Sequence, residues 1–249
     1  MNRTVATVLS VTAAVVLLAG AGAWWFLRDD APEEVDLSAA TAGVAQQDSD
    51  GSVDGAADGG TFDGDVSGTW SVDTDTGDFD YESATGTFAG FRIAEELAGI
   101  GSTTAVGRTG DVSGTMEIDG ETVTAASFEV DLTTITTDDS RRDDKVQDAL
   151  DTSSFPTASF TLTEPIELGS AASTGDPVSV SAIGELTING VTTKVEFPLD
   201  AQVVDGTVVV VGSLDIAFSD YGVEVPSSPI VLSVDDNGTL ELQLLLMKN

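Results

Sequence analysis

The sequence contains no cysteine and no histidine. These absences exclude disulfides, zinc sites built from His and Cys, and catalytic Ser-His-Asp or Cys-His systems. A bound metal would need oxygen ligands alone, and a lipoprotein anchor is excluded because it requires a cysteine. Basic residues are scarce too, with 9 Lys and Arg against 43 Asp and Glu and a net charge of -34. Because nucleic-acid contacts need a basic surface, we expect no nucleic-acid partner.

A long apolar run occupies the N-terminus. Val5 to Leu27 carries no charge and is long enough to span a bilayer, which takes about 20 residues. Aromatic residues at 24–26 match an interfacial belt at its far end. We therefore predict that residues 1–28 form a signal anchor, a single transmembrane helix with the remaining chain outside the cytoplasm. The alternative is a signal peptide cut after Ala21-Gly22-Ala23, which would make the protein secreted.

An acidic stretch follows the apolar run. Residues 29–67 are rich in Asp, Ala, Gly and Ser and contain almost no large apolar side chain. Such a segment cannot bury enough surface to offset the entropy lost on ordering, so we predict a disordered linker. A flexible chain of this length spans about 35 Å, which would tether the next domain near a membrane.

Alternating apolar and polar residues fill the chain from 68 to 249 and predict one antiparallel all-β domain, a sandwich or a barrel. The strongest hairpin signal is the stretch GELTINGVTTKVEFPL, whose Asn189-Gly190 turn sets Ile188 opposite Val191. A second two-residue turn at Asp205-Gly206 sets Val203 opposite Val208, and the same register continues to Phe197 and Leu214.

Two further hairpins are predicted with three-residue loops. The loop from Asp236 to Gly238 sets Val234 opposite Leu240, and the loop from Asp119 to Glu121 sets Ile118 opposite Thr122 and places Met116 on the face of Phe128. Two short helices are also predicted. One is the charged segment from Ser140 to Leu150, and the other lies near Ala94 to Ala98.

Seven segments, in this order along the chain, resemble motifs of the YceI-like, polyisoprenoid-binding family: TWSVD (69–73), GTFAGFRI (86–93), SFEVDLTTITT (127–137), Arg142-Asp143, SSFPTASFTL (153–162), GELTINGVTTKVEFPL (184–199) and FSDYGV (218–223). The resemblance implies an eight-stranded antiparallel, lipocalin-like barrel over residues 68–249. It implies an isoprenoid lipid, a quinone or a polyprenyl carrier, held in the barrel for storage or transport. Neither a catalytic residue nor a further cofactor is expected. The histidine common after the first strand of the family is absent here.

Candidate ligand-binding residues follow from the apolar and basic side chains. The residues expected to line an isoprenoid tunnel are Phe88, Phe91, Ile93, Leu97, Ile100, Phe128, Phe155, Phe160, Phe197, Leu214, Phe218 and Tyr221. The alternative is that they fill a solid barrel core. Arg141, Arg142 and Lys145 are candidates for contacting a lipid headgroup, or for pairing locally with aspartates.

Three other functions are weighed against lipid binding. A filled barrel could act as a structural or adaptor protein at the cell surface. The acids at 138–139 and 143–144 would suit a hydrolase only if they faced one cleft across a sugar. The acids from Asp73 to Asp80 do not follow the EF-hand pattern. We expect the partners to be an isoprenoid lipid and a membrane, and a homodimer is compatible with the sequence.

Overall fold

A computed structural model describes residues 31–50, 64–97, 101–224 and 231–249 of the protein. Within these ranges, no helix combines the length and the apolar character needed to cross a membrane. The segment predicted to be a signal anchor, residues 1–28, lies outside the described residues.

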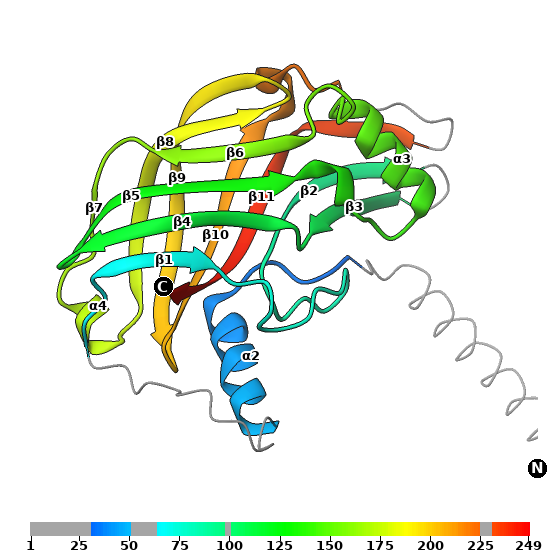
Figure 1. Ribbon diagram of the computed structural model, residues 1–249. Coiled ribbons are helices and arrows are strands. Elements are labelled where there is room, and N and C mark those ends of the chain that lie inside the picture. Colours follow the sequence, from blue (N-terminus) through cyan, green and yellow to red (C-terminus); the bar gives the residue numbers. More distant parts are fainter. Residues whose placement is uncertain (1–30, 51–63, 98–100, 225–230) are drawn as a thin grey trace, which may run out of the picture.

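Eight antiparallel strands form a closed ring (Figure 1). In ring order the strands are β1 (Gly68–Val72), β4 (Val112–Asp119), β5 (Thr122–Asp131), β6 (Thr157–Leu162), β8 (Val178–Ile188), β9 (Val191–Val204), β10 (Thr207–Ala217) and β11 (Val231–Lys248). β1 closes the ring because it pairs with β4 on one side and with β11 on the other. The eight-stranded antiparallel barrel expected from the resemblance is confirmed.

Additional elements extend the ring and cover its ends. β2 (Phe88–Leu97) pairs with β11, and β3 (Gly101–Thr109) pairs with β2, while β7 (Ile166–Glu167) pairs with β5. The helix α3 (Ser140–Ala149), with the short turn η1 (Leu132–Thr134), and the helix α4 (Ala171–Thr174) lie at opposite ends of the barrel (Figure 1). The remaining elements are α2 (Leu37–Asp50) and the turn η2 (Phe218–Tyr221).

The two hairpins with two-residue turns form in the predicted register. Ile188 pairs with Val191, and Val203 pairs with Val208. The two turn residues at 189–190 and at 205–206 all have positive φ angles, as a type I′ turn requires. The β9–β10 ladder ends at the pair of Leu199 and Gly212, short of the predicted pair of Phe197 and Leu214.

The hairpin predicted at Asn237-Gly238 is wrong. β11 passes through this dipeptide as one continuous strand, in which Gly238 pairs with Ile93 on β2 and Ile216 on β10. A register shift on the β2 side absorbs the extra residues as a bulge. The glycine serves close packing here, since a Cβ at Gly238 would lie 2.3 Å from the Phe218 ring.

Two smaller predictions are corrected as well. The β4–β5 turn holds two residues, so that Ile118 pairs with Val123, and a bulge next to Glu117 restores the register. Met116 and Phe128 nevertheless share the inner face, as expected. The helix predicted from Ala94 is absent from the described part of that segment, because β2 continues to Leu97 and pairs with both β11 and β3.

The prediction of a disordered linker is wrong for residues 37–50, which form α2. Ala40 and Val44 of this helix are buried against Val209, Val211 and Leu245, which point outward from β10 and β11. We call residues 31–50 the strap, since they cross the outer wall of the barrel (Figure 1). The prediction failed because side chains as small as Ala40 and Val44 suffice to cover an apolar wall.

A buried charge network joins the strap to the barrel wall. Glu241 of β11 is only 2% exposed, and its carboxylate lies 3.5 Å from the Arg92 guanidinium and 3.2 Å from that of Arg108. Arg92 also donates to the Pro32 carbonyl at 2.8 Å, and Arg108 donates to the Glu33 carbonyl at 2.6 Å. One carboxylate therefore pairs with two guanidinium groups, which in turn bind the strap backbone.

We expect Glu241→Ala to destabilise the protein strongly, because it leaves two guanidinium groups buried without their counter-ion. Breaking a buried ion pair from one side lowers the free energy of unfolding by about 3–5 kcal/mol. Urea unfolding of the full chain measures this loss. Glu164→Ala is the matched control, since Glu164 pairs with Lys194 at 2.8 Å while both side chains are more than half exposed. That exposed pair contributes about 1 kcal/mol at most, so equal losses in the two variants would contradict the prediction.

Candidate functional site

The inner face of the barrel surrounds an apolar cavity of about 220 Å³. Residues at alternate positions of β8 and β9 illustrate how the strands build it. Val180 pairs with Leu199 and Ala182 pairs with Phe197, and all four line the cavity. Because side chains alternate across a strand, the intervening polar residues point to solvent. Lining residues come from β2 and from every strand of the ring except β1, so the cavity extends along the barrel.

The two ends of the cavity differ. At the α3 end the lining residues Leu132, Ile135 and Tyr221 are buried. At the α4 end the lining includes Ala172 and Asp176. Asp176 is the one exposed residue in the described lining, so the cavity comes closest to solvent beside α4. A volume below the 300–1,000 Å³ of typical drug-sized pockets suits a slender chain.

Several of the residues expected in a tunnel do line the cavity: Phe91, Phe128, Phe160, Phe197, Phe218 and Tyr221. Four of these aromatic rings form two pairs that meet edge to face. The ring centroids of Phe160 and Phe197 are 6.4 Å apart, as are those of Phe91 and Phe218. Such contacts hold the rings in fixed orientations and give the cavity wall a defined shape.

Other expected tunnel residues lie elsewhere. Phe88 precedes the inward Ala89 and points outward, with its ring centroid 4.6 Å from the Arg108 guanidinium. Phe155 is 39% exposed and lies against the turn at Gly190. Ile93 and Leu214 pack in the core without lining the cavity. The Leu97 side chain and Ile100 lie outside the described part of the chain.

Many lining residues were not among the sequence candidates. They are aliphatic residues at inward positions, among them Met116, Ala126, Val130, Val180, Leu199, Val210, Leu242 and Leu244. The signal that marks them is strand alternation: Leu242 and Leu244 share one face of β11, and Val210 lies opposite Leu244. Most of the cavity lining is aliphatic, so a prediction based mainly on aromatic residues missed it.

The basic residues proposed to bind a headgroup do not line the cavity. Arg142 forms an ion pair with Glu95 at 2.8 Å and a second one with Asp138. The side chain of Arg141 is 93% exposed, and Lys145 is exposed on the same helix. The structure thus uses Arg142 to fasten α3 to β2.

The acidic pairs weighed as hydrolase residues organise the start of α3. Asp139 accepts a hydrogen bond from the Arg141 amide at 2.8 Å and caps the helix. Asp143 accepts from the Thr137 amide at 2.7 Å, and Asp138 pairs with Arg142. None of these acids lines the cavity. Across the residues that the structure describes, no group of three or more acidic side chains is arranged to hold a metal ion.

Two buried groups near the α3 end have shifted pKa values. Burial raises the pKa of Glu95, the Arg142 guanidinium lowers it, and the Asp138 carboxylate adds to the rise. Burial also raises the pKa of Tyr221. The Thr193 side chain lowers this pKa, and the Asp220 carboxylate raises it further. By strict geometry the Tyr221 hydroxyl has no hydrogen-bond partner among the described residues.

Comparison with known proteins identifies the family. The model of the YceI-like domain matches residues 70–246. The chain belongs to the YceI-like family. No curated protein matches it significantly.

Solved structures of other YceI-like proteins resemble the chain at low sequence identity. A polyisoprenoid-binding domain from Saccharophagus degradans, described as implicated in plant cell wall breakdown, is 18% identical with a TM-score of 0.54, covering 72% of this chain and 98% of its own. BcnA of Burkholderia cenocepacia is 21% identical with a TM-score of 0.48, covering 63% and 95% of the two chains. The first of these similarities supports the barrel fold.

We expect the stability contributed by Glu95 to fall as the pH rises. Its folded-state pKa is raised above the ordinary value of 4.5, so the contribution is fully present below that value and is lost as the pH passes the folded pKa. Glu95→Gln stays neutral and should lose less stability than the wild type between about pH 4 and pH 7. Thermal unfolding across this range measures the difference. Glu129→Gln, on the exposed face of β5, should follow the wild-type curve, and parallel curves for all three proteins would refute the expectation.

Proposed function

We propose that this domain binds an isoprenoid lipid, a quinone or a polyprenyl lipid, with its chain inside the barrel, and stores or carries the lipid without changing it chemically. The observation that carries the proposal is the apolar cavity of about 220 Å³ that extends along the barrel. Membership of the YceI-like family supports it, because a member with the same fold is described as a polyisoprenoid-binding domain.

The physical driving force for binding is burial of hydrocarbon. Each CH₂ group moved from water into an apolar cavity contributes about 0.8 kcal/mol, so a chain of several isoprene units gains affinity without polar contacts. A narrow cavity favours a thin chain because close contact on all sides maximises dispersion. The aliphatic lining and the fixed aromatic rings meet both requirements.

A binding role, as opposed to catalysis, agrees with the chemistry of the described lining. It is dominated by aliphatic and aromatic side chains. The neighbouring acids weighed as a hydrolase pair have other contacts: Asp139 caps α3, and Asp138 forms an ion pair with Arg142. General acid–base chemistry requires groups within hydrogen-bond reach of the substrate, and these acids lie outside the cavity.

We further propose that residues 1–28 attach the domain to a cell membrane and leave the barrel outside the cytoplasm. The uncharged run from Val5 to Leu27 supports this, since its length matches a bilayer span. Cleavage after Ala23 would release the same domain as a secreted protein. In either case the barrel would meet lipids outside the cytoplasm.

A matched pair of substitutions tests whether the cavity binds the lipid. Ala126 lines the cavity, whereas its neighbour Ala125 is exposed on the other face of β5. Ala126→Phe places a ring in the path of the chain and should weaken binding at least tenfold, which corresponds to about 1.4 kcal/mol. Ala125→Phe should bind as the wild type does. Native mass spectrometry of the full chain, with extraction of co-purifying lipid, provides the readout.

Thermal unfolding of both variants separates a blocked cavity from a damaged fold. Overpacking costs about 1–3 kcal/mol, which leaves the barrel folded. If folded Ala126→Phe binds isoprenoid lipids as well as Ala125→Phe does, the lipid occupies some other place and the proposal fails. Absence of any bound or added isoprenoid lipid on the wild type would also refute it.

A further inference from the structure

We propose that the cavity selects isoprenoid lipids with an uncharged head and discriminates against polyprenyl phosphates. This inference rests on the proposed function and adds the chemical class of the head. It follows from where the structure places the basic residues, from the acids at the α4 end of the cavity, and from one buried hydroxyl at the α3 end.

The described basic residues do not line the cavity, although Glu241, which pairs with Arg92 and Arg108, is itself a lining residue. Two of the 9 Lys and Arg, Arg3 and Arg28, lie outside the described residues. On the outer wall, Arg92 and Arg108 share the carboxylate of Glu241. Proteins bind phosphate mainly through Arg, Lys and backbone amides, so committing these two guanidinium groups to the strap removes them from headgroup binding.

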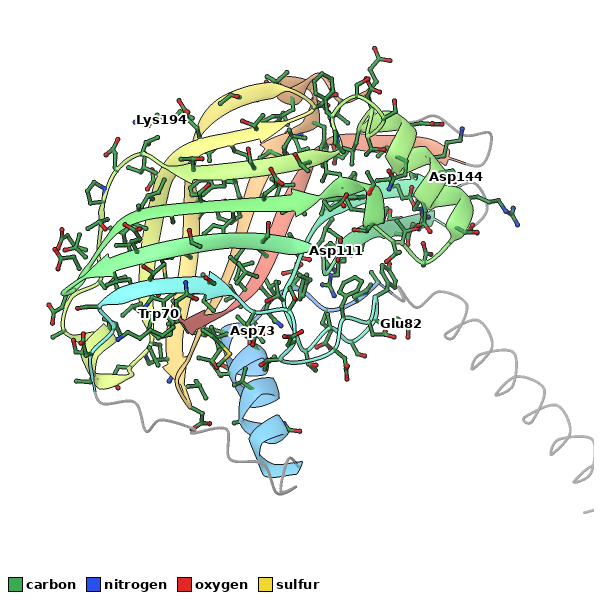
Figure 2. All side chains as sticks on the ribbon, viewed as in Figure 1. Trp70, Asp73, Glu82, Asp111, Asp144 and Lys194 are labelled. Carbon is green, nitrogen blue, oxygen red and sulfur yellow. The ribbon has the colours of Figure 1, made fainter. Side chains whose placement is uncertain are left out.

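The remaining cations are placed similarly. Arg142 is paired with Glu95, while Arg141 and Lys145 are exposed on α3. Lys194 pairs with Glu164 and points away from the barrel (Figure 2). Lys248 lies 5.9 Å from the Trp70 ring centroid and donates to the Asp65 carbonyl. No Lys or Arg side chain belongs to the lining among the residues with described positions.

The α4 end of the cavity is acidic. Asp176 belongs to the lining and is exposed beside α4, where its carboxylate accepts a hydrogen bond from Thr174 at 2.7 Å. A second carboxylate lies on the same end, because Glu121 accepts from the Ser173 hydroxyl of α4 at 3.4 Å. A phosphate head at this end would face like charge on a chain that already carries a net charge of -34.

At the α3 end the described lining offers a neutral hydroxyl group and no cation. The Tyr221 hydroxyl is buried there, and Tyr221 is only 2% exposed and lines the cavity. A hydroxyl can donate to a carbonyl or alcohol oxygen, whereas burying an uncompensated phosphate charge is costly. At either end of the cavity, therefore, an uncharged head meets the more favourable surroundings.

The test compares a polyprenol with the polyprenyl phosphate of equal chain length, both delivered to the full chain in the same nonionic micelles. We expect the wild type to bind the polyprenol at least tenfold more tightly. Asp176→Lys should reduce this preference about tenfold by giving the phosphate a counter-ion at the α4 end of the cavity. Glu196→Lys makes the same change of net charge on the exposed outer side of β9 and should leave the preference unchanged.

The outcomes separate this inference from the proposed function. If the wild type binds both lipids equally, or the phosphate more tightly, the selectivity is refuted while lipid binding stands. If Asp176→Lys and Glu196→Lys shift the preference equally, the overall charge of the protein sets the headgroup preference. The inference that Asp176 at the α4 end of the cavity sets it is then overturned. If neither the polyprenol, nor the phosphate, nor an added quinone binds, the proposed function itself fails.

Discussion

Closure of the sheet by β1 is the constraint on which the rest of the molecule depends. This strand of five residues pairs with β4 and β11 at once. Trp70 at its centre is only 2% exposed and donates from its indole nitrogen to the Val66 carbonyl at 2.9 Å. A closed ring has no free strand edges, so its inner face can stay apolar and incompletely filled without offering a site for aggregation. The apolar cavity is therefore a product of closure, in addition to apolar composition.

Charge is distributed in a way that complements this closure. Inside the barrel the side chains are overwhelmingly neutral, while a few cations are used where separate elements must be held against the wall. Arg92 and Arg108 hold the strap, and Arg142 holds α3. Since acids outnumber bases so greatly, the cations that hold these elements pair with carboxylates, and few basic side chains are left to contact a ligand. Under the proposed selectivity, a strongly acidic composition would influence which lipid head is bound as well as solubility.

The sequence predicted the barrel better than it predicted the site. The turns at Asn189-Gly190 and Asp205-Gly206 formed in the predicted register. Asn, Asp and Gly readily adopt the positive φ angles that these two-residue turns require, so the turn residues alone set the strand pairing. Asn237-Gly238 carries the same signal, yet it lies within β11, where pairing on both sides overrides a local turn. Phe88 was misassigned because selection by residue type ignores which face of the strand an aromatic occupies. The strap was missed because its contacts with Glu241 join parts of the chain far apart in sequence.

The strap also changes how an anchored barrel would move. Its backbone is already bound to the barrel wall at Pro32 and Glu33. If the proposed anchor ends at residue 28, residues 29–31 connect it to the bound backbone at Pro32, and three residues span at most about 10 Å. The barrel would then be mounted on the bilayer in a restricted orientation instead of ranging on a long flexible chain. Lipid exchange would be limited to the barrel surface that this orientation turns toward the bilayer, and delivery to a distant acceptor would require the acceptor to approach the membrane.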